Sequence, residues 1–367
     1  MNVREADRYL QALAEVRASG GRAAVATIVR VRGSAYRREG TRMLVRPDGT
    51  YECALSGGCL EPAVADAATR VLATGTPALI AYDLADDSVW GLNIGCSGAV
   101  DIRIERIEDD PVTLAWHEAL REGQAAVLVT PLTGDAGRRL LRRTGDPIGS
   151  LGVPALDAAA DAIGRARLSS RGGRAAVTVV DGIELFADVN LTPTPLVIFG
   201  AGYDAVPLAR QAWALGFAVT VVDPRQAYLR PDLFTGARLV LSSSDDAATA
   251  AACGPETFAV VMHHHVERDR LALRTCLDAG VAYVGVLGPR ARYERLRADL
   301  SAAGWQAPPA ARTRVHSPAG LALGGETPEE VALSILAEMV AVREGFAGGF
   351  LNGTSASLHA PAAGARP

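Results

Sequence analysis

The chain has 367 residues, a length that predicts two or three domains. Its 37 basic and 41 acidic residues give a net charge of −4, which argues against nucleic acid or an anionic membrane as the main partner. The first 20 residues lack the apolar core of a signal peptide, and no apolar run reaches the roughly 18 residues of a membrane span. Five cysteines without a C-x-x-C pair indicate reduced thiols in a cytoplasmic protein and make a structural zinc site unfavourable.

Residues 1–110 predict a small α+β domain. Apolar residues at helical spacing indicate an amphipathic helix over Arg4–Arg17, and alternating alanine and valine then indicate a strand over Arg22–Val31. A Pro-Asp-Gly turn joins two further strands, Thr41–Arg46 and Thr50–Leu55, into a hairpin.

The hairpin leads into a glycine-punctuated loop, Ser56-Gly57-Gly58-Cys59-Leu60-Glu61, which precedes an alanine-rich helix that runs to about Ala73. We expect Cys59 in the first turn of that helix, where unpaired amides and the positive end of the helix dipole favour a thiolate. The alternative is that Cys59 is a small buried hydrophobe, the common fate of a free cysteine. The two glycines favour a reactive thiol, because they remove side chains from the approach to the sulfur.

A second glycine-rich loop, Gly91–Gly98, contains Gly95 and Cys96 and leads into a strand over Ala99–Ile107. Two thiols in two such loops of one small domain predict a shared pocket. The remaining cysteines are interpreted as structural: Cys53, Cys253 and Cys276.

Residues 111–191 show a weaker pattern and are expected to form a poorly defined middle segment with a hairpin. The elements that can be placed are a helix near Val112–Arg121, a strand at Ala125–Thr130 and a hairpin of Ala175–Val180 with Ile183–Asp188. Between them, residues 134–174 have no clear period and are expected to be loop or a poorly packed helix. A stiff Thr-Pro-Thr-Pro linker at residues 192–195 then indicates a domain boundary.

Residues 196–345 predict a Rossmann-like domain with a parallel sheet. The apolar strand Leu196–Phe199 is followed by Gly200-Ala201-Gly202-Tyr203-Asp204-Ala205, which fits the G-x-G-x-x-G/A fingerprint of a dinucleotide-binding turn. A helix to Leu215 and a second strand that ends in Asp223 complete the unit. Asp223 stands where a ribose-diol acceptor is expected, and Arg225 just beyond it suits a 2′-phosphate.

Several polar residues follow the later strands of this domain. The strand Thr257–Met262 is followed by three histidines. Adjacent side chains on an extended chain point to alternating sides, so the three cannot all face one metal ion. His264 is nevertheless a candidate pocket residue, because open α/β sheets bind ligands outside the carboxyl ends of their strands. Gly288, Pro289 and Arg290 follow the strand Ala282–Leu287 and begin the next helix, with Arg292 nearby.

The last predicted helix begins with Thr327 as N-cap, Pro328 at the first position and Glu330 closing a capping box, and it reaches about Arg343. Residues 346–367 are rich in Gly, Ala, Ser and Pro and are expected to form a disordered tail. The fold class is therefore α/β: a C-terminal Rossmann-like parallel-sheet domain plus an N-terminal α+β domain.

The assembled motifs resemble the xanthine dehydrogenase accessory factors of the XdhC/CoxI type over roughly residues 1–110 and 196–345. The segments that carry the resemblance are SGGCLE at Ser56–Glu61, the loop Gly95–Gly98, the turn Gly200–Gly202 with Asp223-Pro224-Arg225, Tyr283–Gly288, and Ser317-Pro318 with Thr327–Glu330. The chain departs from the residues usual in the family at Ser97, Tyr203, His263 and Pro289.

The resemblance implies a chaperone that holds molybdenum cofactor, as molybdopterin or its dinucleotide form, while a terminal sulfur is installed. It further implies a homodimer that contacts a molybdenum hydroxylase and a cysteine desulfurase, with Cys59 and Cys96 as contacts to molybdenum or sulfur. The candidate cofactor-binding residues are Ser56, Gly57, Gly58, Cys59, Glu61, Gly95, Cys96, Gly200, Gly202, Tyr203, Asp223, Arg225, His264, Gly288 and Arg290. No catalytic residue is assigned.

Two alternatives stay open at this point. One is an NAD(P)-dependent oxidoreductase that places nicotinamide in the Rossmann crevice and uses a thiol or a histidine as an acid. The other is a scaffold that has lost ligand binding, to which the intact glycine turn is unfavourable.

Overall fold

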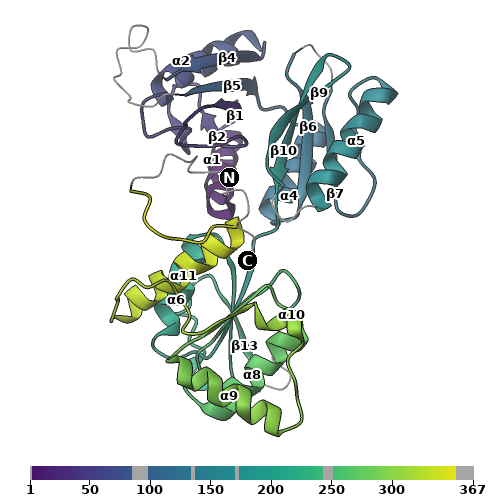
Figure 1. Ribbon diagram of the computed structural model, residues 1–367. Helices are drawn as coiled ribbons and strands as arrows, with labels where there is room; N and C mark the ends of the chain where they lie inside the picture. The colour runs from purple at the N-terminus through teal and green to yellow at the C-terminus, as the bar shows by residue number, and fades with distance from the viewer. Residues whose placement is uncertain (1, 85–97, 134–136, 170–172, 243–250, 353–367) are drawn as a thin grey trace. The chain divides into compact units, whose positions relative to one another are not determined.

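The computed structural model describes residues 2–84, 98–133, 137–169, 173–242 and 251–352 (Figure 1). The chain divides into two compact units, Met1–Thr192 and Pro193–Pro367. The first unit contains two antiparallel sheets and the second contains one parallel sheet, so the expected combination of an α+β part with a Rossmann-like part is confirmed.

The first antiparallel sheet has the strand order β3-β2-β1-β5-β4. Its strands are β1 (Ala24–Arg32), β2 (Arg42–Val45), β3 (Tyr51–Glu52), β4 (Ala78–Asp83) and β5 (Ala99–Arg106). Alternate apolar residues of β1 and β5, such as Ile28 and Ile102, pack beneath helix α2 (Glu61–Thr74). The strand predicted over residues 50–55 is shorter in the structure, where β3 covers only Tyr51–Glu52, and β4 was not predicted.

Two further helices of the first unit, α1 (Val3–Ala18) and α4 (Pro111–Arg121), pack against each other and against both antiparallel sheets. Helix α1 begins with a capping box between Asn2 and Glu5, and α4 begins with Asp110 as N-cap. Their apolar faces share one core with Leu44 of β2 and with strands of the second sheet.

The second antiparallel sheet has the order β8-β7-β6-β10-β9 and corrects the expectation of a loose middle segment. Its strands are β6 (Ala126–Pro131), β7 (Arg139–Arg142), β8 (Ile148–Gly149), β9 (Ala176–Val180) and β10 (Ile183–Asn190). Helix α5 (Pro154–Ser169) packs on the sheet through Leu156, Ala160, Gly164 and Leu168. This buried stripe has a regular four-residue spacing, but small residues occupy half of it, so it gives little hydrophobic signal.

The second unit is a six-stranded parallel sheet with the order β13-β12-β11-β14-β15-β16. Its strands are β11 (Pro195–Phe199), β12 (Ala218–Asp223), β13 (Arg238–Leu241), β14 (Phe258–Val261), β15 (Tyr283–Val286) and β16 (Val315–His316). Helices α6 (Ala205–Ala214) and α11 (Pro328–Glu344) cover one face, and α8 (Val266–Asp278) and α9 (Arg290–Ala302) cover the other (Figure 1). The short elements η1 (Gln226–Tyr228) and α10 (Pro309–Arg312) complete the described unit.

The strand order reverses direction between β11 and β14, which are neighbours although a long segment of chain separates them. In an open parallel sheet this reversal opens a crevice at the carboxyl ends of the strands. The predicted capping box of Thr327 and Glu330 at the start of α11 is confirmed. Residues 315–316, for which no element was predicted, form an edge strand.

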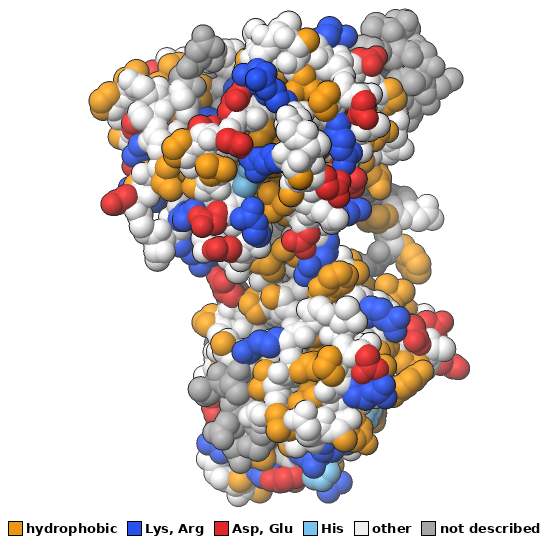
Figure 2. Space-filling view, turned by 180° about the vertical axis from the view of Figure 1, so that it is seen from behind, with side chains coloured by type: hydrophobic (Ala, Val, Ile, Leu, Met, Phe, Trp, Pro, Cys, Tyr) orange, Lys and Arg blue, Asp and Glu red, His pale blue; other side chains and the backbone are white. Residues whose placement is uncertain are grey.

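Basic and acidic side chains are interspersed on the visible face of each unit (Figure 2), which agrees with the near balance of charge in the sequence. Among the described residues, no helix combines the length and the apolarity that a membrane crossing requires.

Candidate functional site

The loop between β3 and α2 is held by a buried carboxylate. Glu61, only 1% exposed, accepts hydrogen bonds from the backbone N–H groups of Leu55 at 2.9 Å and Ser56 at 2.7 Å, and from the Ser56 hydroxyl. Burial raises the pKa of Glu61, but the hydrogen bonds from Ser56 and Leu55 outweigh it, so the pKa lies below its ordinary value. Glu61 is therefore a charged brace inside the protein.

The Ser56 hydroxyl passes this order on to the residues that follow. Its oxygen accepts hydrogen bonds from the backbone N–H groups of Gly58 at 3.2 Å and Leu60 at 3.1 Å. The Cys59 thiol also donates to it, with Sγ and Oγ 3.3 Å apart. One hydroxyl thus fixes the loop on both sides of the cysteine.

The two glycines of the loop leave space on the side where a Cβ would point. A Cβ built on Gly57 or on Gly58 meets no atom within 4 Å, and Gly58 has a φ of 110°, which a side chain would strain. No described residue packs against Gly57 in a way that would require a glycine there. The open space at both positions suits the close approach of a ligand to the backbone beside Cys59.

The sequence pattern predicted Cys59 in the first helical turn, but Cys59 lies outside the helix. Helix α2 begins at Glu61 with Leu60 as its N-cap, so Cys59 precedes the helix, because the Ser56 hydroxyl holds the backbone in a turn up to Leu60. Its side chain is half-buried against the core beneath α2. Its expected partner Cys96 lies with Gly95 outside the described residues.

The other described cysteines occupy structural settings. Cys276 is fully buried in α8, and burial raises the pKa of its thiol well above the ordinary value. Burial also raises the pKa of Cys53 and of Cys253 to about 11. Cys53 directly follows β3 with a φ of 64°, so it is not inside a strand. All three are poor thiolates at neutral pH.

The glycine turn after β11 contains two glycines with different roles. A Cβ on Gly200 would lie 2.7 Å from the carbonyl oxygen of Met262 and 2.8 Å from the backbone nitrogen of His263, at a φ of 116°. Gly200 is therefore required for the turn itself to pass β14. A Cβ on Gly202 meets no atom within 4 Å. Its open space leaves backbone accessible, as a phosphate-binding turn needs.

Asp223 was expected to accept a ribose diol, and the structure corrects this expectation. Its side chain is fully buried and accepts from the backbone N–H of Ala201 at 2.8 Å. Arg225 donates to both carboxylate oxygens at 2.8 Å, and its guanidinium lies 3.7 Å from the ring centroid of Tyr228. Burial raises the pKa of Asp223, but these partners lower it below its ordinary value. The carboxylate holds the glycine turn and Arg225 and has no free face for a sugar.

The three histidines after β14 separate into three settings. His263 is buried, donates its backbone N–H to Asp269 at 3.0 Å and has Nδ1 3.2 Å from the same carboxylate, which also pairs with Arg292. His264 has a φ of 58° and an exposed side chain, and His265 accepts from the backbone of Arg268 as the N-cap of α8. The backbone is therefore not extended at His264, although the prediction against a shared metal ion was based on an extended chain. Within the described ranges, no group of three metal-ligating side chains occurs.

His264 is the predicted residue that does reach the glycine turn. Its Nε2 lies 3.1 Å from Oδ2 of Asp204, the residue before α6, so the contact crosses from the end of β14 to the turn after β11. Tyr203 beside it is 78% exposed. Asp204 had not been given a role, because a contact between residues sixty positions apart leaves no local pattern.

Gly288 and Arg290 lie at the end of β15, but among the described residues neither makes a hydrogen bond or ion pair with His264 or Asp204. Arg290 is the first residue of α9, with Pro289 as N-cap, and its exposed side chain is 3.6 Å from Glu294. Gly288 has a φ of 105°, and a Cβ there would approach Arg292 at 3.0 Å. The guanidinium of Arg292 donates a hydrogen bond to the buried carboxylate of Asp269, so it is not free for a ligand.

Fold and site together define a Rossmann unit joined to an α+β unit that presents a braced cysteine loop. Family models match both parts: the XdhC Rossmann domain over residues 196–339, and the XdhC and CoxI family over residues 16–83. The chain is 32% identical over 347 residues to a probable xanthine dehydrogenase subunit from Bacillus subtilis (strain 168), covering 88% of this chain and 93% of that relative. The chain belongs to the XdhC and CoxI family.

Two further comparisons extend over most of the chain. The molybdenum cofactor insertion chaperone PaoD from Escherichia coli (strain K12) is 27% identical over 327 residues, which cover 89% of this chain and 85% of PaoD. A crystal structure described as a xanthine dehydrogenase from Bacillus halodurans matches with a TM-score of 0.72 and 26% identity, covering 90% of this chain and 94% of the other. The predicted resemblance is thereby confirmed.

Proposed function

We propose that the protein is an accessory factor that holds molybdenum cofactor and delivers it to a molybdenum hydroxylase of the xanthine dehydrogenase type. Family membership and the likeness to a relative named as an insertion chaperone support this proposal. The observation that carries it is the braced loop of the first unit. There a half-buried thiol, Cys59, follows two open glycine positions and lies 3.3 Å from the Ser56 hydroxyl, which Glu61 fixes.

The residues of this loop suit the metal end of such a cofactor. When bound, the cofactor supplies the molybdenum centre that the recipient hydroxylase requires. The Cys59 thiolate is a soft ligand for molybdenum or its sulfur, with Cys96 as its proposed partner. Ser56 orients Cys59 through its hydroxyl, and the fixed loop lowers the entropy lost on binding.

In the second unit, Gly202 and the start of α6 suit the phosphate of the same class of ligand, because the amides of a helix N-terminus bind phosphate. The oxidoreductase alternative loses its proposed ribose acceptor, since Asp223 is fully engaged with Ala201 and Arg225. We therefore propose the accessory factor and not the oxidoreductase. Holding the cofactor during sulfuration, with a cysteine desulfurase as a further partner, belongs to the same proposal.

The test is cofactor retention after expression in a host that makes molybdenum cofactor. Molybdenum content and pterin fluorescence are measured for the wild type, Cys59→Ala and the matched control Cys253→Ala, whose thiol is half-buried in the other unit. We expect the wild type and the control to retain metal and pterin and Cys59→Ala to lose most of both. Wild-type protein that contains neither and instead turns over a nicotinamide cofactor would contradict the proposal.

A further inference from the structure

An acidic residue, Asp204, lies in the glycine turn that is proposed to bind the phosphate of the ligand. The backbone N–H groups of Gly202, Tyr203 and Asp204 donate to no group among the described residues. The next two amides, those of Ala205 and Val206, are already bonded to carbonyl oxygens of the turn. The first three amides are thus the free donors, and a carboxylate attached to one of these residues repels a phosphate that they bind.

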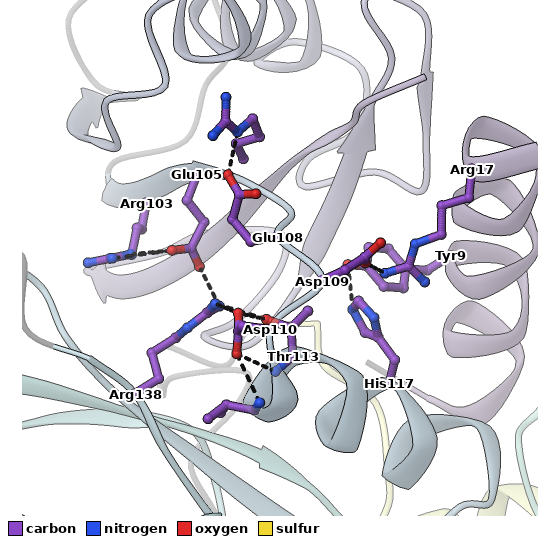
Figure 3. Close-up of polar contacts among 12 residues, drawn as sticks. Tyr9, Arg17, Arg103, Glu105, Glu108, Asp109, Asp110, Thr113, His117 and Arg138 are labelled. Atoms are coloured by element: carbon purple, nitrogen blue, oxygen red, sulfur yellow. Dashed lines mark hydrogen bonds and ion pairs between the residues drawn. The ribbon is translucent and has the colours of Figure 1, made fainter. Parts of the chain in front are cut away.

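Another aspartate of the chain, Asp110, shows where a carboxylate at the start of a helix is usually directed. It accepts hydrogen bonds from the backbone N–H groups of Val112 at 2.9 Å and Thr113 at 3.0 Å, in the first turn of α4 (Figure 3). Such bonds satisfy donors that a helix leaves free at its N-terminus. Asp204 occupies the same position before α6 but makes no bond of this kind.

The sequence of α6 explains why Asp204 does not cap its own helix. An N-cap carboxylate binds the amide of the second or the third helical residue. The third residue of α6 is Pro207, which has no N–H, and the N–H of the second residue, Val206, is bonded to the carbonyl of Tyr203. With both amides unavailable, the carboxylate of Asp204 turns toward the end of β14.

The partner of this carboxylate is His264, whose Nε2 lies 3.1 Å from Oδ2 of Asp204. The main chain is anchored on both sides of His264. His263 donates its backbone N–H to the buried carboxylate of Asp269 at 3.0 Å, and His265 is the N-cap of α8. Between these anchors His264 has a φ of 58°, a conformation that is uncommon for residues other than glycine. The backbone therefore presents the imidazole to the glycine turn without help from a ligand.

The pair of His264 and Asp204 limits the repulsion between the carboxylate and a phosphate. An ionised carboxylate only accepts hydrogen bonds, so Nε2 of His264 carries the hydrogen in this contact. A neutral imidazole holds the carboxylate toward β14, and a protonated imidazole also cancels its charge. A phosphate at the turn favours the protonated form, because negative charge nearby stabilises a cation. The side chains are 59% and 33% exposed, and such a pair contributes little to stability, so its effect on the turn is the more important one.

We propose that His264 is a positioning residue of the phosphate-binding turn: it holds Asp204 toward β14, so that the amides of residues 202–204 can receive an anionic phosphate. The inference rests on the proposed function, because it concerns the turn to which that function assigns the phosphate. His264 acts here through Asp204 and makes no ligand contact of its own. Removal of the carboxylate should therefore make the imidazole dispensable.

The test is calorimetry of full-length protein with ADP and with inorganic pyrophosphate as probes. The proteins are the wild type, His264→Ala, Asp204→Asn and the double variant. We expect His264→Ala to weaken binding of both probes about tenfold, because an unpaired like charge then lies beside the phosphate. Asp204→Asn should bind at least as tightly as the wild type, and the double variant should bind as tightly as Asp204→Asn. Adenosine, which has no phosphate, should show no difference among the four proteins.

A matched control for the loss of one partly exposed carboxylate is Asp299→Asn on α9, whose side chain is 44% exposed. It should leave both affinities unchanged. A double variant that binds as weakly as His264→Ala would show that His264 contacts the ligand directly, and the inference would be overturned. Wild-type affinity in His264→Ala, or a loss of affinity in Asp204→Asn alone, would overturn it as well.

Thermal unfolding verifies that the variants fold. If His264→Ala does not fold, His264→Gly takes its place, because glycine adopts a φ of 58° without strain. Equal affinity in all variants would refute only the role of His264, since the turn would still bind phosphate. Absence of binding of either probe to the wild type and to Asp204→Asn at millimolar concentration would instead show that the turn is no phosphate site, which would overturn this inference together with the phosphate contact in the proposed function.

Discussion

Valine substitutions at Gly200 and Gly202 separate the structural from the ligand-binding role of the turn after β11. Gly202→Val places a side chain where no atom lies within 4 Å and where the backbone is outside the left-handed region. The free energy of unfolding should change by no more than about 0.5 kcal/mol, as for most exposed substitutions. Affinity for a phosphate-bearing ligand should fall at least about tenfold, or 1.4 kcal/mol, because the side chain blocks the approach to the backbone.

Gly200→Val should have the opposite outcome. Its Cβ would come within 2.7 Å of the Met262 carbonyl oxygen and 2.8 Å of the His263 nitrogen, both backbone atoms that cannot rotate away. A side chain at a φ of 116° adds backbone strain of about 1–3 kcal/mol, and the overpacking adds about as much. A total of about 4 kcal/mol corresponds to a fall in Tm of about 8–16 °C for a unit of this size.

The assays are thermal unfolding of both variants and calorimetry with ADP, NAD⁺ and molybdopterin as probes. Wild-type affinity for all three probes in folded Gly202→Val would show that the turn only connects β11 to α6. A Gly200→Val variant as stable as the wild type would show that the backbone of Met262 and His263, just after β14, shifts to accommodate the new side chain, and the packing explanation would then be wrong.

The remaining predictions concern the buried carboxylates Glu61 and Asp223, the thiols and the oligomeric state. Glu61→Gln should lower the free energy of unfolding at pH 7 by about 1–3 kcal/mol. Because the pKa of Glu61 is lowered in the folded protein, the stability that its charge contributes is complete above the ordinary value of 4.5 and is lost as the pH falls through the folded pKa. Urea unfolding should therefore give a smaller stability difference between wild type and variant at pH 3.5 than at pH 7. Asp223→Asn should cost about 3 kcal/mol by chemical denaturation, because Arg225 and the Ala201 amide lose a charged acceptor; an unchanged midpoint would remove the argument. Alkylation across pH should be slowed more by Cys59→Ala than by Cys96→Ala, and equal rates for both would contradict the assignment of Cys59 as the reactive thiol. Light scattering at micromolar concentration should give a homodimer, and a monomer would refute that expectation.

Elements with a strong local pattern could be predicted from the sequence. The run Leu196–Phe199, the glycine turn and the strand ending at Asp223 fall within a few residues of β11, α6 and β12, because a buried strand needs a continuous apolar run and the turn needs glycine. The capping box at Thr327 was equally local. Helix α5 was missed because its buried stripe includes Gly164, whose missing side chain lets Leu141 pack within 2.8 Å of the Cβ position. Contact at that distance selects for smallness, which hydrophobic periodicity does not detect.

The candidate site was predicted by position more accurately than by role. Spacing placed Asp223 at the correct end of β12, but it could not show that Arg225 occupies both carboxylate oxygens. Likewise, Ser56 and Glu61 belong to the cysteine loop, yet their function as a brace follows from hydrogen bonds that a spacing rule does not contain. The pairing of Asp204 with His264 depends on the reversal of strand order and could only be found in three dimensions.

Both loops proposed to bind ligand use the same device, a buried carboxylate that receives backbone N–H groups of the loop. Glu61 receives the amides of Leu55 and Ser56, and Asp223 receives the amide of Ala201 within the glycine turn. A carboxylate used in this way is a poor ligand contact, since its side chain is buried and the loop already donates three hydrogen bonds to Glu61 and four to Asp223. Ligand contacts must then come from the groups that the braced loop presents: the Cys59 sulfur in the first unit and the open backbone at Gly202 in the second. Because the braces fix these groups before binding, replacing Glu61 or Asp223 should weaken binding through lost order, even though neither carboxylate is a proposed contact.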